Sequence, residues 1–233
     1  MKAKIAVIWL AFGCLGSIGL LANTEGSLAA DNAGSPNFAF RAVALGNGTE
    51  VAVGPGNQIH TAIRGRAWTD QKVPTVASLY DVTYGNDRFV AVGNEGLVLA
   101  SADGLDWTPR DGRTDERLRS IAFAQGMFVA VGYAGTVISS TDSEHWVARQ
   151  SGTRQRLLSI CYGHNLFVSV GWNGTIITSK DGRHWATQYS GTTAQLGHVA
   201  FANDTFVVLG KDGIVLTSAD GVAWSGGGTF AIK

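Results

Sequence analysis

Residues 128–140 read FVAVGYAGTVISS, two apolar and mostly β-branched runs on either side of a Gly-x-x-Gly turn. The same pattern stands one 39-residue step earlier, at 89–101 (FVAVGNEGLVLAS), and later at 167–179 (FVSVGWNGTIITS) and 206–218 (FVVLGKDGIVLTS). The glycine turn supplies the positive φ angles that a tight hairpin requires. Each copy therefore predicts two antiparallel strands.

The flanks of each hairpin predict two more strands. A β-type segment precedes the hairpin, as in SIAFAQ at 120–125 and SICYGH at 159–164, and a weaker one follows a tryptophan that also recurs every 39 residues. No segment after residue 30 has a helical apolar period. A repeat of this length with four strands is typical of a propeller, so we predict an all-β fold, a β-propeller of five four-stranded antiparallel blades. The repeated tryptophans are Trp68, Trp107, Trp146, Trp185 and Trp224.

The two ends of the repeat array decide whether the ring closes. Only nine residues follow Trp224, where the fourth strand of the last blade belongs. Residues 229–233 could form that strand, or residues 37–41 could supply it from the other end. We expect a closed ring, because an open array leaves two uncovered blade faces. A fragment of a longer propeller and two chains completing one ring are the alternatives.

The beginning of the chain has the pattern of an export signal. Lys2 and Lys4 precede an apolar run over residues 5–22, and Ser27-Leu28-Ala29 matches a small-residue cleavage site. We therefore predict cleavage after Ala29 and export to the periplasm or the extracellular space.

The predicted cleavage divides the chain into a signal peptide at 1–29, a short linker at 30–37 and the five-bladed propeller at 38–233. An uncleaved anchor is one alternative, because the apolar run is nearly long enough to span a bilayer. A lipid attached at Cys14 is another.

Charge and cysteine content narrow the classes of partner. Removal of residues 1–29, which hold two lysines and one glutamate, leaves 16 Lys+Arg against 17 Asp+Glu and a net charge of about −1. We therefore expect no nucleic-acid partner and no membrane insertion after cleavage. Cys161 is then the only cysteine, and alanines occupy the matching positions 122 and 200. A small buried residue is favoured there over a nucleophile or a metal ligand.

A second repeated motif connects the third predicted strand to the tryptophan. It reads SADGLDW at 101–107, STDSEHW at 140–146, SKDGRHW at 179–185 and SADGVAW at 218–224, whereas the first unit has AIRGRAW at 62–68. The pattern S-x-D-[GS]-x-x-W resembles the Asp-box, or BNR, repeat of sialidases, sortilin-type receptors and photosystem II assembly factors, although it is one residue shorter. The resemblance implies a propeller over roughly residues 38 to 228.

We interpret these motifs as structural rather than catalytic. An aspartate in such a turn accepts backbone N–H groups of its own turn, and the tryptophan ring fills the space between blades. The resemblance places such turns away from the active face of the propeller. The four aspartates are Asp103, Asp142, Asp181 and Asp220.

A binding surface is predicted where the Gly-x-x-Gly tips share a face with the segments between blades. Those segments, 110–119 and 149–158, are rich in arginine, and aromatic side chains stand at two tips. Arginine, tyrosine and tryptophan dominate binding hot spots, and the photosystem assembly factors are similar in using an arginine-rich face on a protein client. The competing interpretation is a solvated rim neutralised by nearby acidic residues, namely Asp111, Asp115 and Glu116. The predicted binding residues are Glu95, Arg113, Arg117, Tyr133, Arg154, Arg156, Trp172 and Lys211.

The first strand of each blade is predicted to line the central channel. Asp81 and His198 occupy equivalent positions there, and the two repeats between them have Ser120 and Ser159 at that position. They define a candidate polar lining, although a hydrogen-bonded core role is the commoner use of such residues.

The sequence therefore predicts an exported, non-catalytic scaffold that binds a protein partner and needs no cofactor or metal. The arginines concentrate in two neighbouring blades, no unit carries an inserted loop, and no phosphate-binding or nucleophile motif is present. A carbohydrate-binding propeller is one alternative, favoured if Trp172 and Tyr133 are exposed and coplanar with a groove. A sialidase-like exo-glycosidase is the other, and it requires carboxylates that converge with arginines.

Overall fold

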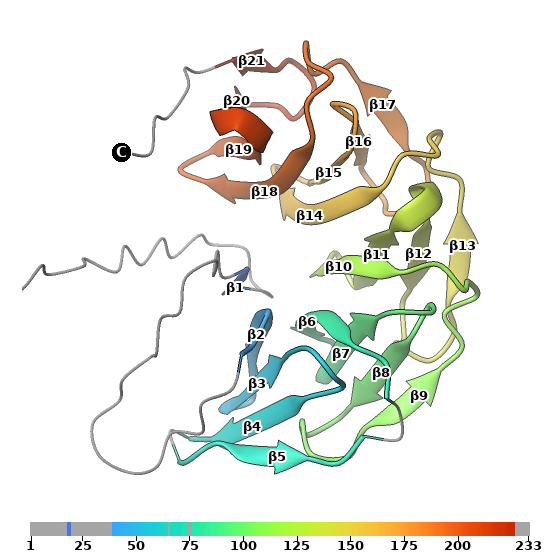
Figure 1. Cartoon of the computed structure of the whole chain (residues 1–233), viewed down its shortest axis with the longest axis vertical. Coiled ribbons are helices and arrows are strands. Elements are labelled where there is room, and N and C mark those ends of the chain that lie inside the picture. The colour runs from blue at the N-terminus through green and yellow to red at the C-terminus, as the bar shows by residue number, and fades with distance from the viewer. Residues whose placement is uncertain (1–17, 20–38, 65, 74–75, 227–233) are drawn as a thin grey trace, which may run out of the picture.

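The structure, a computed structural model, describes residues 18–19, 39–64, 66–73 and 76–226. Within them the chain forms five antiparallel sheets, here called blades 1 to 5 in sequence order, set around a central axis (Figure 1). The strands of each blade follow one another in sequence, and the first of the four repeat strands lies nearest the axis. The predicted all-β, five-bladed propeller is confirmed.

The strand bounds follow the 39-residue repeat. Blade 1 contains β2 (Ala42–Gly46), β3 (Thr49–Val53), β4 (Ile59–Ile63) and β5 (Thr69–Gln71). Blade 2 contains β6 (Leu79–Gly85), β7 (Arg88–Gly93), β8 (Val98–Ser101) and β9 (Thr108–Arg110). Blade 3 contains β10 (Leu118–Ala124), β11 (Met127–Gly132), β12 (Val137–Ser140) and β13 (Val147–Arg149).

Blade 4 contains β14 (Leu157–Gly163), β15 (Leu166–Gly171), β16 (Ile176–Ser179) and β17 (Ala186–Gln188). Blade 5 contains β18 (Leu196–Ala202), β19 (Thr205–Gly210), β20 (Val215–Ser218) and β21 (Ser225–Gly226). One-turn 3₁₀ segments, η1 (Tyr133–Gly135) and η2 (Lys211–Gly213), stand at two hairpin tips. The described residues contain no α-helix, and hence none that could cross a membrane.

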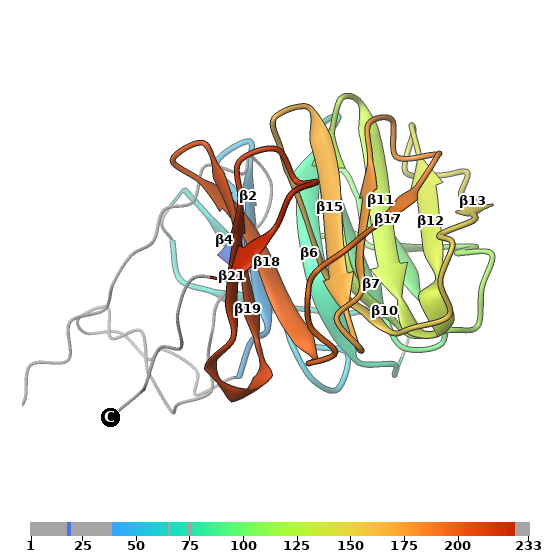
Figure 2. The ribbon, with the colours of Figure 1, turned by 90° about the horizontal axis from the view of Figure 1, so that it is seen from above.

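The hydrophobic core lies between blades rather than inside them. Val90, Val92 and Val98 of blade 2 pack against Leu118 and Phe128 of blade 3, and the same arrangement recurs at each following junction. Seen from above, the blades stand side by side with their broad faces together (Figure 2). Burying one such aliphatic or aromatic side chain contributes about 1.5–3 kcal/mol, so each junction stabilises the two blades that share it.

The repeated tryptophan completes each junction. Trp107 packs with residues of blades 1 and 2, and Trp146 does so with residues of blades 2 and 3. The indole N–H of Trp146 donates to the Ser143 carbonyl at 3.2 Å, which fixes the ring in the interblade space. The predicted role is confirmed for Trp107, Trp146, Trp185 and Trp224.

The ring is open within the described residues. Inner strands of successive blades pack together from β2 through β18, but no comparable packing joins β18 and β19 to β2 and β3 (Figure 1). The predicted closure with five blades is therefore not seen. The last blade obtains its fourth strand from β21, residues 39–41 form no strand, and residues 37–38 and 227–233 lie outside the described part.

The predicted signal peptide and linker, 1–29 and 30–37, lie outside the described residues except for β1 (Ile18–Gly19). This two-residue strand pairs antiparallel with β2. Cleavage after Ala29 would remove it and leave β2 as the inner edge of blade 1.

Candidate binding surface

Two predicted arginines lie beside the two predicted aromatic residues because one backbone contact recurs in consecutive blades. The N–H of Tyr133 donates to the carbonyl of Arg117 at 2.9 Å, and the N–H of Trp172 donates to the carbonyl of Arg156 at 2.9 Å. Each bond ties a Gly-x-x-Gly tip to the residue that enters the inner strand of the same blade. The tips and the interblade segments therefore share one face, as predicted.

The tip geometry explains why the turn motif is required. The residue after the aromatic position has a positive φ in every repeat of the motif, for example 52° at Ala134 and 53° at Asn173. The following glycines, Gly135 and Gly174, also have positive φ, of 73° and 64°. These two positions turn the chain sharply and leave the preceding aromatic side chain at the end of the blade.

The aromatic and guanidinium groups stack alternately across blades 3 and 4. Arg117 lies 4.9 Å from the ring centre of Tyr133 and donates from Nη1 to its hydroxyl at 3.2 Å. Arg156 lies 4.4 Å from the same tyrosine ring and 4.4 Å from the ring of Trp172. All of these separations fall within the range of cation–π attraction.

The stack continues into blades 2 and 1 through Tyr80. Arg117 lies 5.3 Å from the Tyr80 ring, Arg119 lies 4.4 Å from it, and Arg41 lies 4.3 Å from it. Arg41 also donates from Nη1 to the Leu79 carbonyl at 2.9 Å, which anchors its side chain to the neighbouring blade. We call this set the arginine–aromatic ladder; its members are Arg41, Tyr80, Arg117, Arg119, Tyr133, Arg156 and Trp172.

A β-bulge places two members of the ladder. The pairing between β6 and β7 shifts between Leu79 and Asp81, and that between β10 and β11 shifts between Leu118 and Ser120. The residues inside these shifts are Tyr80 and Arg119. A bulge re-aims the unpaired residue, so these side chains join the face instead of alternating with their neighbours along the strand.

The ladder concentrates positive charge on this face, and its Arg119 interacts electrostatically with the buried carboxylate of Asp81. No ion pair to a carboxylate is found for its four arginines within the described part of the chain. Burial lowers the pKa of Arg119, and Arg41 and Arg117 lower it further, while Tyr133 and Tyr80 act in the opposite direction. The Arg119 Nε is buried without a hydrogen-bond partner.

The other predicted binding residues lie apart from the ladder. Arg113 pairs with Asp111 at 3.1 Å on an exposed turn, and Arg154 is exposed on the segment leading into blade 4. Glu95 and Lys211 stand at the exposed tips of blades 2 and 5. Asp111 therefore neutralises Arg113 rather than the ladder.

Three ladder residues were not among the predicted binding residues, although Arg119 lies in the arginine-rich segment 110–119 that was assigned to this face. Arg41 precedes the first inner strand, and Tyr80 and Arg119 follow the leucine that opens their inner strands. The same position is Leu158 in blade 4 and Gly197 in blade 5. The repeat alignment shows this variation, but only the register shift shows that the position turns toward the binding face.

Asp81 has a structural position between blades 2 and 3. Its carboxylate accepts hydrogen bonds from Ser120 Oγ at 2.8 Å, the Ile121 N–H at 2.9 Å and the Val82 N–H at 2.9 Å. Burial raises the pKa of Asp81 to about 6, although these hydrogen bonds and the charge of Arg119 oppose the rise.

The same inner-strand contact continues around the axis with serine. Ser120 Oγ accepts from the Ile160 N–H at 3.3 Å, and Ser159 Oγ accepts from the Val199 N–H at 3.2 Å. His198 follows in blade 5, keeps solvent contact, and has a pKa lowered by desolvation and by the charge of Arg119. These inner-strand side chains therefore connect blades, and no bond between Asp81 and His198 is present.

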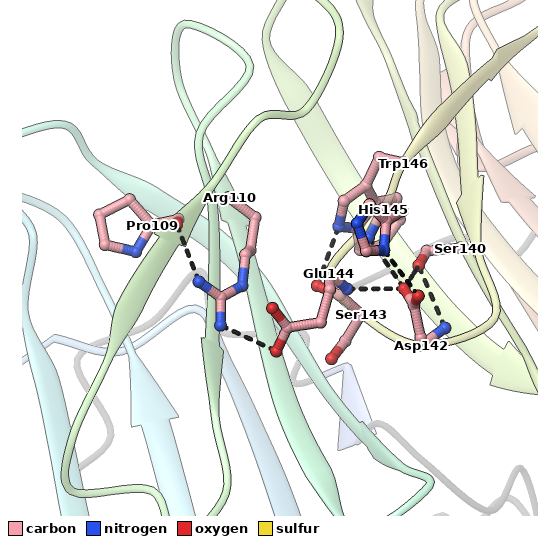
Figure 3. Close-up of polar contacts among 8 residues, drawn as sticks. All are labelled: Pro109, Arg110, Ser140, Asp142, Ser143, Glu144, His145 and Trp146. Atoms are coloured by element: carbon pink, nitrogen blue, oxygen red, sulfur yellow. Dashed lines mark hydrogen bonds and ion pairs between the residues drawn. The ribbon is translucent and has the colours of Figure 1, made fainter.

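The aspartate turns stand at the other end of the blades. Asp142 Oδ1 accepts the N–H groups of Glu144 and His145, both at 2.8 Å, and Oδ2 contacts His145 Nδ1 at 2.8 Å (Figure 3). These contacts hold the pKa of Asp142 far below its usual range, with the His145 N–H contributing most. The prediction that these aspartates bind their own turns is confirmed.

An ion pair joins neighbouring blades near this turn. Arg110 Nη2 lies 2.9 Å from Glu144 Oε1, so this arginine of the predicted cluster is held at an interblade contact (Figure 3). No group of three or more potential metal ligands occurs among the described residues. Cys161 is buried between blades 4 and 5, as predicted.

The sheet order and the interblade core define the chain as a β-propeller protein. No protein-family model matches the sequence, and no curated protein matches it. Solved structures do match. One is YCF48 bound to D1 peptide, with 18% identity and a TM-score of 0.61 over 78% of this chain and 66% of that one.

Two other solved structures have the same fold. YCF48 from Cyanidioschyzon merolae has 15% identity and a TM-score of 0.62, covering 82% of this chain and 72% of that one. Virginiamycin B lyase from Staphylococcus aureus has 11% identity and a TM-score of 0.72, covering 79% and 67%. The chain thus spans about two thirds of the length of these proteins. The predicted likeness to photosystem assembly-factor propellers is confirmed at the level of the fold.

Proposed function

We propose that this protein is an exported, non-catalytic propeller that binds a segment of another protein on the arginine–aromatic ladder. The observation that carries the proposal is the continuous stack of four guanidiniums and three aromatic rings across blades 1 to 4. Its extent suits an extended polypeptide, which can place successive side chains on successive blades.

The charge of the ladder favours a segment that bears carboxylates. Each guanidinium presents several N–H donors in a planar fork that matches a carboxylate. The rings hold the guanidiniums in place, so less side-chain entropy is lost when a ligand binds. The structure of YCF48 with a D1 peptide shows that a protein of the same fold binds a peptide.

The stacking disfavours a carbohydrate ligand. Trp172 is 41% exposed, but Arg156 lies over its ring at 4.4 Å. Tyr133 has Arg117 and Arg156 within 4.9 Å and 4.4 Å of its ring centre. A sugar would need a free aromatic face, and guanidinium groups compete for these rings, one at Trp172 and two at Tyr133.

The geometry also supports the non-catalytic reading. A glycosidase needs two carboxylic groups that face one another across the scissile bond. Asp81 is the carboxylate next to the ladder residue Tyr80. It already accepts hydrogen bonds from the Ser120 hydroxyl and from the Ile121 N–H. This arrangement leaves it to connect blades rather than to act on a substrate.

The test is binding of the purified protein to an array of extended peptides, half rich in Asp and Glu and half with the matching amides, alongside a glycan array. We expect selective binding to the acidic peptides that weakens with salt. Arg117→Glu and Arg156→Glu should each weaken it on the order of tenfold or more, since a close charge pair becomes a repulsion.

Arg183→Glu is the matched control. Arg183 is exposed on the aspartate turn of blade 4, at the opposite end of β16 from Trp172, and this substitution makes the same change of charge. Equal loss of binding in the control would show a nonspecific charge effect and refute the assigned surface. Glycan binding without peptide binding would replace the proposal with a lectin function.

A further inference from the structure

Among the residues that the structure describes, nothing covers the outward face of blade 5 as the next blade covers blades 1 to 4. In β11 and β15 every residue is buried, whereas in β19 burial alternates, with Phe206 and Val208 buried and Thr205, Val207 and Leu209 partly exposed. Alternate residues of a strand point to opposite faces. One face of blade 5 is therefore packed against blade 4, and the other is uncovered.

The uncovered face keeps the side chains of an interblade junction. Val129 and Val131 of blade 3 are fully buried against Leu157 and Phe167 of blade 4. Val207 and Leu209 take the corresponding positions in blade 5, where they pair directly with Ala200 and His198 of β18. Blade 5 thus presents the aliphatic side chains of a junction, and no further blade packs on them among the described residues.

Blade 1 does not offer the complementary surface. Where blades 2 to 5 have a fully buried phenylalanine, blade 1 has Glu50, and where blade 2 has Leu99 it has His60. His60 Nδ1 lies 2.6 Å from Asp70 Oδ1. Burying Glu50 against Val207 and Leu209 would desolvate a carboxylate without a partner, which disfavours head-to-tail association of two chains.

We propose that the uncovered face of blade 5 binds the same face of a second copy of the chain, forming a two-fold symmetric dimer. Such an interface must be complementary to itself. Its centre, Val207 and Leu209, is aliphatic, and the exposed His198 lies beside Leu209 as its partner across the strand pair. Its rim carries Lys211 and Asp212 side by side, both exposed and without an ion pair in the described part. A two-fold axis brings the lysine of each copy to the aspartate of the other.

The position of this rim follows from blade 3. The 3₁₀ tip η1 of that blade contacts β14 of blade 4, so a tip borders the face that meets the next blade. The tip η2 has the same place in blade 5. Lys211 and Asp212 therefore stand at the edge of the surface that we assign to the dimer.

The experiment is sedimentation velocity of the purified protein from low-micromolar to near-millimolar concentration. We expect a reversible monomer–dimer equilibrium. Leu209→Glu should raise the dimer dissociation constant at least about tenfold, because each copy would then place an unpaired charge in an aliphatic contact. Val222→Glu is the matched control, since Val222 is 52% exposed at the opposite end of β20 and should leave the equilibrium unchanged.

A charge exchange tests the two-fold arrangement. Lys211→Glu alone should weaken the dimer, and Lys211→Glu with Asp212→Lys should restore it, because the exchanged pair is again self-complementary. Near-ultraviolet circular dichroism checks folding, and Val207→Ser replaces Leu209→Glu if that variant does not fold. A monomer at every concentration, or a dimer that ignores Leu209→Glu and Val207→Ser, would overturn the proposal. Arg117→Glu should leave dimerisation unchanged, which separates this test from that of the ladder.

Discussion

Asp81→Ser is expected to make folding less dependent on pH, because Asp81 is a carboxylate in a position where blades 3 and 4 have serine. Burial raises the pKa of Asp81 from 3.8 to about 6. A raised pKa means that the folded state holds the proton more tightly than the unfolded state. The contribution to stability is therefore full below pH 3.8 and is lost as the pH rises through about 6.

The size of the effect follows from the two pKa values. Each pKa unit corresponds to about 1.4 kcal/mol, so the full loss above both values is about 3 kcal/mol. Between about pH 5 and about pH 8 the loss is about 1 kcal/mol, because part of the change occurs below that range. Asp81 is only 9% exposed, so solvent screening reduces this figure little.

The measurement is urea unfolding of the wild type and of Asp81→Ser at several pH values. Other titrating groups are common to both proteins, so the difference in free energy of unfolding isolates Asp81. We expect that difference to shift in favour of the variant by roughly 1 kcal/mol from about pH 5 to about pH 8. The serine retains an acceptor for the Ile121 N–H, as Ser120 does for Ile160. A difference that stays constant over this range would refute the reasoning.

Three further substitutions test the packing. Ser143→Gly should raise the free energy of unfolding in urea by about 1–2 kcal/mol. Ser143 has a φ of 65° and a buried Oγ without a hydrogen-bond partner, and the other three aspartate turns have glycine at this position. Gly182→Ala should lower the midpoint of thermal unfolding, because the new Cβ would lie 2.8 Å from Val129 Cγ2 and residue 182 has a φ of 67°. The expected cost is about 1–3 kcal/mol, and an unchanged midpoint would contradict the packing described. Cys161→Ala should cost only about 1 kcal/mol, as Ala122 fills the equivalent position, and the native thiol should resist a thiol reagent until the protein unfolds.

Much of the candidate site could be read from the repeat. Arg117 and Arg156 lie one repeat apart, and so do Tyr133 and Trp172, so equivalent places on adjacent blades followed directly. The bulge at Tyr80 and Arg119 could not be read in this way. It depends on a register shift between inner strands, and strand register is set by pairing rather than by the residues of one strand.

The sequence by itself determined the blade, because each hairpin and each aspartate turn forms within 39 residues that recur nearly unchanged. Tertiary structure decided which side chains meet across blades. Arg117 reaches Tyr80 only because blades 2 and 3 pack face to face. It also decided that the ring stays open between blades 5 and 1 in the described residues. Closure depends on the small angles between successive blades, which add up around the axis and are not specified by any single repeat.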